Sequence, residues 1–167
     1  MKSNKGITLV ALVITIVVVL ILASITINYG TKAIKKSQLE NMKTNMLLIK
    51  AKAKEYVEQA NFKAGVNNEY KDENGNLKEV VASELKGTLE NDTFSYITLD
   101  DGQYLYNVNS ELENMGLKNV NIDNGKNEKY LVRYDVKNAT VEIYNTIGYN
   151  DNGTTKNSLT QLEQIEY

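Results

Sequence analysis

The chain begins with an uncharged, strongly apolar stretch that runs from Ile7 to Ile27. Neither Gly nor Pro interrupts these 21 residues, and the nearest charges are those of Lys5 and Lys32. A bilayer core of about 30 Å needs roughly 20 helical residues at about 1.5 Å each, so the length suits a membrane-spanning helix. Hydroxyl side chains in this stretch are expected to bond carbonyls of the preceding turn: Thr8, Thr15, Ser24 and Thr26.

Three other interpretations of this stretch are weaker or remain open. A small domain has little room for a buried helix or strands of this length that are apolar on every side. A secretory signal usually has an apolar region of about 7–15 residues before a small-x-small site, which Ile21-Leu22-Ala23 matches poorly. An uncleaved anchor stays open. Its orientation is not set by charge, because lysines lie on both sides: Lys2 and Lys5 before the stretch, and Lys32, Lys35 and Lys36 after it.

A second pattern occupies residues 32–62, where apolar side chains recur at spacings of three and four and predict an amphipathic helix. The stripe consists of Leu39, Met42, Met46, Ile49, Ala53, Tyr56 and Ala60. No Gly occurs between Thr31 and Gly65, so we predict one helix from Ile7 to Phe62, roughly 84 Å long. Packing of the stripe on a head is favoured over an independent coiled coil, because charges do not pair across its edges.

The remaining residues predict a head of short strands and helices, and hence an α+β fold. Residues 95–99 and 104–108 alternate on either side of Asp101-Gly102 and predict a hairpin. Residues 129–136 and 139–145 predict a second hairpin around Lys137-Asn138. Further expectations are a short helix within 77–90, a helix capped by Ser110 and Glu113 that stops near Gly116, breaks at Gly148 and Gly153, and a final helix or extended tail over 158–167.

Composition narrows the classes of function. The formal net charge is −2, and without the first six residues 17 basic and 21 acidic side chains would remain, giving −4. Binding of nucleic acid by bulk charge is therefore unsupported, although a role in DNA uptake stays open. Cys, His, Trp and Pro are absent, which removes disulfides, thiol chemistry and the commonest general base and metal ligand. We expect no enzyme, no cofactor and no metal.

One loop has part of the spacing of a calcium site. Asp72, Asn74 and Asn76 match the first oxygen ligands of such a loop. The pattern requires Gly at the sixth place and Glu at the twelfth, where this chain has Leu77 and Ser83. We interpret the segment as a solvated turn.

Other polar and aromatic groups are also interpreted as structural. Asp100 with Asp101, and Glu111 with Glu113, have the spacing of paired carboxylates, but any acidic protein contains such pairs and glycoside chemistry would need a cleft. The 11 Tyr residues favour packing of the rings in the core over an aromatic binding surface.

The segment KGITLVALVITIVVVLILASI resembles the start of type IV prepilins, a family that includes pilus subunits and the pseudopilins of type II secretion and DNA uptake. The family pattern is a short basic leader ending in Gly, an N-methylated first mature residue, and then Thr-Leu. The resemblance implies a leader of Met1–Gly6, cleavage by a prepilin peptidase between Gly6 and Ile7, and methylation of Ile7. Thr8-Leu9 follow as in the family.

Two positions depart from the family pattern. The mature chain usually starts with Phe or Met, whereas Ile7 stands here. The fifth mature residue is usually a Glu that pairs with a neighbour's terminal amine during assembly, whereas Ala11 stands here. Ala11 favours a minor subunit or an anchor that does not polymerise. The later sequence YLVRYDV…ATVEIYNTIGY resembles heads of pilin-like proteins from Gram-positive bacteria.

The resemblance implies a pilin-like α+β fold in which a long N-terminal helix packs on a small antiparallel sheet. Its parts would be the leader 1–6, a transmembrane and assembly half 7–30, an amphipathic half 31–62 and a head 63–167. The implied partners are the membrane, the prepilin peptidase, other pilin-like subunits and an assembly platform. The N-terminus would be cytoplasmic and the head extracellular, on a surface filament if assembled. The expected function is a minor subunit of a type IV pilus or of a secretion or competence pseudopilus, with a non-polymerising anchored extracellular binding protein as the alternative.

Overall fold

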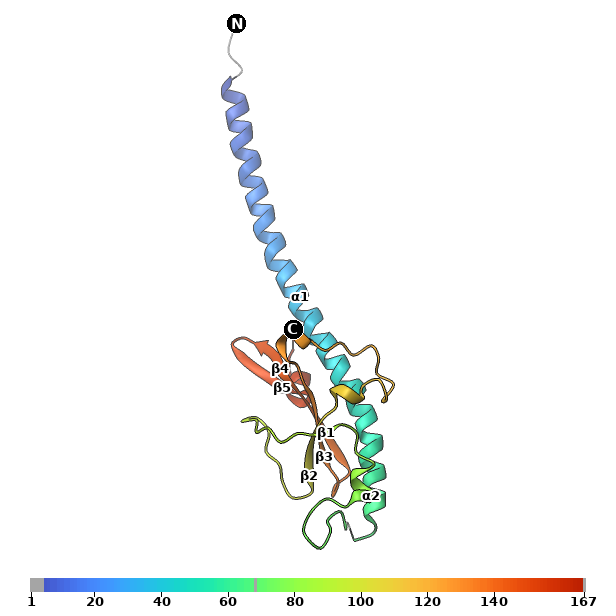
Figure 1. Cartoon of the computed structure of the whole chain (residues 1–167). Coiled ribbons are helices and arrows are strands. Elements are labelled where there is room, and N and C mark those ends of the chain that lie inside the picture. Colours follow the sequence, from blue (N-terminus) through green and yellow to red (C-terminus); the bar gives the residue numbers. More distant parts are fainter. Residues whose placement is uncertain (1–4, 68, 167) are drawn as a thin grey trace. The chain divides into compact units, whose positions relative to one another are not determined.

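The computed structural model describes residues 5–67 and 69–166, without the side chains of residues 5–10, 25–29 and 124. Backbone contacts divide the chain into two units, residues 1–40 and 41–167, and each is described by itself. The elements, in chain order, are α1 (Lys5–Ala64), α2 (Glu79–Ala82), β1 (Thr88–Leu89), β2 (Gln103–Asn107), β3 (Tyr130–Asp135), β4 (Thr140–Asp151), β5 (Thr154–Ser158) and α3 (Leu159–Glu163), with single 3-10 turns at Asn109–Glu111 and Asn124–Lys126 (Figure 1).

The single long helix predicted over residues 7–62 is confirmed by α1. In the second unit the predicted apolar stripe is its buried side: Met46, Ile49, Ala53 and Ala60 are fully buried. This side packs on the sheet, where the Asn45 Nδ2 donates to the Tyr130 hydroxyl at 3.3 Å. The helix is therefore held by burial of one stripe rather than by propensity alone.

The sheet is a five-stranded antiparallel meander in the order β1-β2-β3-β4-β5. The predicted hairpin of residues 129–136 and 139–145 is confirmed as β3 and β4, paired from Tyr130 with Asn145 to Asp135 with Thr140. Because side chains alternate between the faces of a strand, the two faces have different contents. The face toward α1 holds the fully buried Tyr134. A separate buried cluster on the other side consists of Leu105, Leu131 and Tyr144.

The predicted strand over residues 95–99 is wrong. Ser95 and Tyr96 lie in a turn, in which the Ile97 amide donates to the Phe94 carbonyl at 3.0 Å. Phe94, Tyr96 and Ile97 lay their side chains on the cluster around Leu105 instead of pairing along an edge. The hydrogen-bonding edge of β2 is taken by β1 and by the Glu90 amide, which donates to the Leu105 carbonyl at 2.8 Å.

The turn at Asp101-Gly102 is confirmed, since Gly102 has φ +86° and the Gln103 amide donates to the Asp100 carbonyl at 3.0 Å. The second predicted arm is β2. Its partners are β1 and β3 rather than residues 95–99.

Two predicted helices are shorter than expected. The helix within 77–90 is reduced to the four residues of α2, and β1 follows it. The capping box at Ser110 and Glu113 is wrong, because the 3-10 turn already begins after Val108 and has no side-chain cap. The stop near Gly116 is confirmed by its φ of +77°.

The last part of the chain folds as a hairpin and a capped helix. Gly148 does not end β4, which continues to Asp151, but it lies at φ +67° in the irregular stretch between Tyr144 and Tyr149 where the register with β5 shifts. Gly153 marks the turn before β5. The tail forms α3, with Ser158 and Gln161 in a reciprocal capping box. The long helix packed on this antiparallel sheet gives the chain a pilin-like topology.

A buried polar network bends β4 between Tyr144 and Tyr149, where its register with β5 shifts. Asn145 is fully buried, and its Nδ2 donates to the buried Glu128 carboxylate at 2.5 Å. Its Oδ1 accepts the amides of Ile147 and Gly148, each at 3.0 Å. One side chain thus replaces ladder bonds that the bulge removes.

Candidate functional site

The implied processing site lies at the start of α1. The backbones of Gly6 and Ile7 are helical, and their side chains lie outside the described residues. Ala11 is the first residue whose side chain is described, and it is exposed. Ala11 therefore presents only a methyl group at the position where the resemblance to prepilins leads one to expect Glu.

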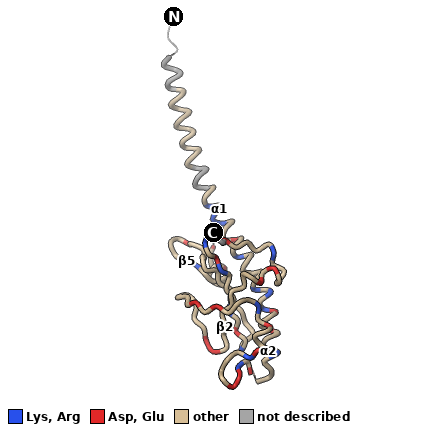
Figure 2. Tube along the Cα trace, viewed as in Figure 1, with Lys and Arg blue, Asp and Glu red and all other residues tan. Residues whose placement is uncertain are grey.

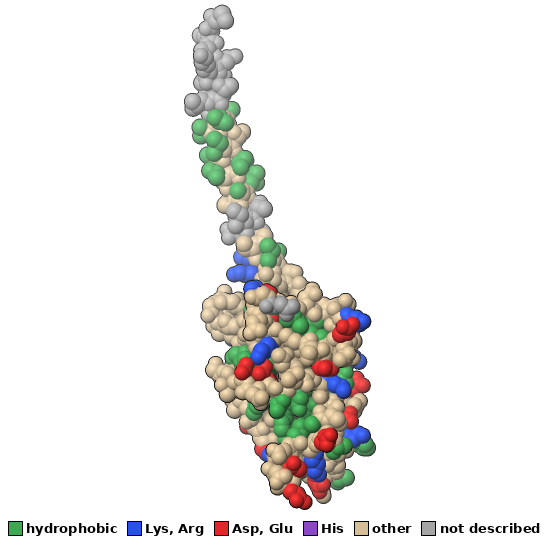
Figure 3. All heavy atoms as spheres, viewed as in Figure 1, with side chains coloured by type: hydrophobic (Ala, Val, Ile, Leu, Met, Phe, Trp, Pro, Cys, Tyr) green, Lys and Arg blue, Asp and Glu red, His purple; other side chains and the backbone are tan. Residues whose placement is uncertain are grey.

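Residues 11–24 form a helical stretch with exposed apolar side chains, which cover the described part of the helix in Figure 3. Leu12, Leu20 and Leu22 are each exposed by about 60%. The predicted hydroxyl bonds are confirmed at Thr15 and Ser24, which donate to the carbonyls three residues earlier at 2.8 Å. Among the residues whose description allows the test, no helix has the length and apolarity to cross a bilayer.

A second exposed surface lies on α1 in the unit 41–167. We call this surface the outer face of α1, and it consists of Leu47, Leu48, Ala51, Glu55, Glu58, Gln59 and Phe62. Leu47 and Leu48 are 47% and 44% exposed, and Phe62 is 83% exposed. The sequence pattern did not predict this surface, although these apolar residues stand outside the buried stripe and could have indicated it.

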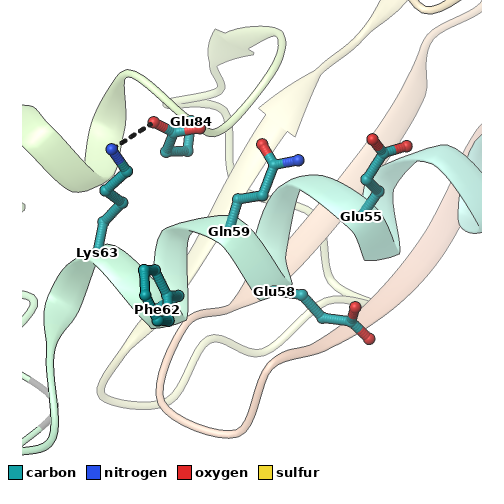
Figure 4. A pocket seen from close by; sticks show the side chains of 6 residues that line it. All are labelled: Glu55, Glu58, Gln59, Phe62, Lys63 and Glu84. Atoms are coloured by element: carbon teal, nitrogen blue, oxygen red, sulfur yellow. Dashed lines mark ion pairs between the residues drawn. The ribbon is translucent and has the colours of Figure 1, made fainter.

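The outer face is grooved. Figure 4 shows one row of side chains from Glu55 through Gln59 to Lys63, and a second from Glu58 to Phe62. Both rows follow the i, i+4 spacing of a helix surface. The space along them is a pocket of about 550 Å³, which Glu84 also lines. Such a groove between side-chain rows is the shape that the side chains of a second helix fill.

The two carboxylates of the outer face form ion pairs with lysines beside it. The Nζ of Lys52 lies 3.7 Å from a Glu55 oxygen, and that of Lys54 lies 3.8 Å from a Glu58 oxygen. All four side chains are about half exposed, so these pairs contribute little to stability.

An apolar cavity of about 320 Å³ lies under residues 92–99. Phe94, Ile97, Leu99 and Leu105 line it, together with Asp92 and two threonines. Hydrophobic side chains gather on the face of the head shown in Figure 3. The Lys129 Nζ donates to Glu90 at 2.8 Å and to Asp92 at 3.0 Å, so the acidic groups nearest this cavity are already paired.

The loop with part of the calcium spacing uses its carboxylate internally. The Asp72 Oδ1 accepts the amides of Asn74 at 2.9 Å and Asn76 at 2.8 Å. These bonds lower the pKa of Asp72, and the bond from the Asn76 amide has the largest effect. The geometry is that of a self-capped turn, as interpreted from the sequence. Within residues 5–67 and 69–166, no group of three acidic, His or Cys side chains could hold a metal ion.

The two carboxylate pairs do not share a site. The Asp101 carboxylate accepts hydrogen bonds from Lys71 and from the Tyr70 hydroxyl, the latter at 2.5 Å, and the bond to Lys71 is the main reason that the pKa of Asp101 is lowered. It fastens the loop after α1 to the turn before β2. Glu113 forms an exposed ion pair with Lys118 at 3.0 Å.

Most of the described Tyr side chains are buried in the core of the head. Tyr130 and Tyr134 are among the largest fully buried side chains. The Tyr134 hydroxyl donates to the Lys86 carbonyl at 3.0 Å, and burial raises the pKa of Tyr134 strongly. Tyr106 meets Tyr134 edge to face at 5.5 Å. These contacts confirm the core packing expected for this part of the tyrosine set.

No protein-family model, curated protein or solved structure matches the chain. The topology is that of a pilin-like protein, with a long N-terminal helix packed on an antiparallel sheet of five strands.

Proposed function

We propose that this chain is a prepilin-like structural subunit, and a minor one, of a type IV pilus or of a type II secretion or competence pseudopilus. The observation that carries the proposal is the single helix α1, whose N-terminal part is apolar on its exposed surface and whose C-terminal part packs on the sheet of the head. A helix of two such halves suits a subunit that is stored in lipid and then assembled.

The proposed processing follows from the residues around the start of α1. A prepilin peptidase would remove Met1–Gly6, and Ile7 would become the methylated first residue. Residues 7–30 would lie in the membrane, with the leader in the cytoplasm and the head outside the cell. Assembly would move the apolar helix from lipid into a bundle of neighbouring subunits, where their side chains replace the acyl chains. The role is structural and involves no catalysis or cofactor.

Ala11 favours a second candidate, a membrane-anchored extracellular binding protein that never polymerises. A methyl group at this position offers no acceptor for a neighbour's terminal amine, so the charge pair of a major subunit is lost. The two candidates differ in processing. A Gly6→Asp variant would accumulate uncleaved if the chain is a prepilin, whereas a simple anchor would be unaffected.

The deciding experiment is intact and N-terminal peptide mass spectrometry on protein taken from its native membrane. A chain that starts at Ile7 with one added methyl group supports the prepilin proposal. A chain that keeps Met1–Gly6 refutes the processing and leaves the anchored binding protein. Gly6→Asp is the matched control, since it changes the cleavage motif and leaves residues 7–27 intact.

A further inference from the structure

Three exposed lysines follow the apolar stretch of α1 closely. Lys32, Lys35 and Lys36 come five, eight and nine residues after Ile27, the last residue of that stretch. Figure 2 shows basic residues on α1 beyond its apolar part. Spacings of three and four residues from Lys32 place the other two on the same side of the helix. We call these three residues the lysine cluster.

The lysine cluster belongs to a strongly basic part of the chain. Residues 28–54 contain seven Lys and one acid, Glu40, so their net charge is +6. Residues 55–167 contain 10 basic and 20 acidic side chains, so their net charge is −10. The near-neutral total therefore conceals a basic helix segment, and a segment of this charge favours an anionic partner.

The position of the lysine cluster along α1 selects that partner. A helix rises about 1.5 Å per residue, so the Cα atoms of Lys32 and Lys36 lie about 7.5 Å and about 13.5 Å beyond that of Ile27. Helix side chains lean toward the N-terminus, and the long apolar stem of a Lys lets its ammonium group reach the nearest polar layer. With Ile27 at the edge of a hydrocarbon core, that layer is the lipid headgroups, about 5–8 Å thick on each side.

We propose that the lysine cluster binds the phosphate groups of anionic lipids at the outer surface of the membrane that holds residues 7–30. The proposal rests on the proposed function, and only on the part of it that places residues 7–30 in a bilayer. Each lysine close to an anionic lipid surface contributes about a fivefold preference for that surface. Three lysines on one side of the helix then keep the stored subunit at a fixed depth until assembly removes it.

The test uses the full-length chain in detergent, mixed with equal amounts of phosphatidylglycerol and phosphatidylcholine. Native mass spectrometry counts the molecules of each lipid that stay bound. Both lipids have a phosphate group, but only phosphatidylglycerol has a net negative charge. The unmodified chain should retain more phosphatidylglycerol, and the combined variant Lys32→Gln, Lys35→Gln, Lys36→Gln should lose this preference by at least about fivefold. Arg at the same three positions should keep the preference, because the charge remains.

The matched control removes three lysines of the same helix that lie too far from the apolar stretch. The Cα atoms of Lys50, Lys52 and Lys54 are about 34–41 Å beyond that of Ile27, so their ammonium groups cannot reach the same headgroups. The combined variant Lys50→Gln, Lys52→Gln, Lys54→Gln changes the net charge by the same amount and should keep the lipid preference. An equal loss in both triple variants would overturn the proposal, since total charge rather than position would then decide lipid binding.

A second measurement separates this proposal from the proposed function. Vesicles of the two lipids are loaded with the chain, washed at alkaline pH and floated on a density gradient. A chain that floats but shows no preference for phosphatidylglycerol overturns the lysine cluster alone, whereas a chain that does not float overturns the membrane part of the proposed function as well. Loss of chemical cross-links between copies in the Gln variant, with the lipid preference unchanged, would assign the lysines to the acidic residues 55–167 of a second copy instead.

Discussion

Replacement of Asn145 by Ala is expected to destabilise the head far more than replacement of an exposed Asn. Asn145 is fully buried and makes three hydrogen bonds, one to the Glu128 carboxylate at 2.5 Å and two from backbone amides of the bulge at 3.0 Å. The Asn145→Ala change leaves a buried carboxylate oxygen and two amides without this partner. It also removes the group that fixes the bend of β4.

The magnitude follows from these bonds. A hydrogen bond to a charged group contributes about 1.5–3 kcal/mol, and an unsatisfied buried amide costs about 1–3 kcal/mol. Taking the lower end of each range for the one charged bond and the two amides, because water can enter the vacated space, gives about 3.5 kcal/mol of lost stability. For a unit of this size, we expect the melting temperature to fall by about 10 °C.

The assay is thermal unfolding of the full-length chain in detergent, followed by near-ultraviolet circular dichroism. The chain has 11 Tyr and no Trp, so this signal reports tyrosine packing. Many of these rings are in the head, among them the fully buried Tyr130 and Tyr134. Asn114→Ala is the matched control, since its exposed amide bonds only Glu111, at 3.2 Å, and its loss should change stability by less than about 0.5 kcal/mol. Equal melting temperatures for the two variants would refute the structural role of the network.

Three further outcomes are expected. Gly148→Ala should lower the free energy of unfolding in urea by at least about 2 kcal/mol, because φ is +67° and an added Cβ would lie 2.7 Å from three atoms of β5. The control is Gly153→Ala, whose added Cβ meets no atom within 4 Å, so it should lose only the backbone cost of about 1–2 kcal/mol. The pKa of Asp72 is lowered, so its hydrogen bonds persist above the ordinary value of 3.8 and are lost as the pH falls through the lower folded value. The Asn76 amide resonance should therefore move only in that acid range. Movement at higher pH would contradict the hydrogen bond from the Asn76 amide to Asp72. Tyr134→Phe should cost about 1 kcal/mol in the same unfolding assay, because one bond to a backbone carbonyl is lost while the ring stays packed.

The elements that the sequence predicted correctly are those in which the local pattern of apolar residues matches the side chains that the structure buries. The stripe from Leu39 to Ala60 has a helical period, and its members in the second unit are buried or half-buried. The hairpin of β3 and β4 was predictable because its strands bury nearly continuous apolar residues, such as Leu131, Val132 and Ile143, on both sides of a polar turn. Local pattern and tertiary burial agree in both cases.

The failures occurred where partners outside the segment decide the structure. β5 has the sequence TTKNS, without an apolar alternation, and it forms because β4 offers a pairing edge and buries Asn157 and Ser158. Residues 95–99 alternate as a strand should, but the edge of β2 that they would pair with is held by β1. No local pattern reports which edge is already occupied.

The candidate sites were predictable to different degrees. The processing residues Gly6 and Ile7 follow from a motif, and they stay a prediction because their side chains lie outside the described residues. The outer face of α1 was not predicted, because the helical period of apolar residues marks only the side that is buried. Leu48 and Phe62 are fourteen residues apart on the opposite side, and their shared exposure emerges only once the sheet shows which side it covers.

The N-terminal stretch of α1 exposes much more apolar surface than the outer face does. Ten large apolar residues between Leu12 and Leu22 are about half exposed. Full burial of such a side chain contributes about 1.5–3 kcal/mol, so covering the remaining half of all ten contributes on the order of 10 kcal/mol. The outer face of α1 offers only three such residues, namely Leu47, Leu48 and Phe62. Cover of the N-terminal stretch would therefore contribute far more free energy than cover of the outer face of α1.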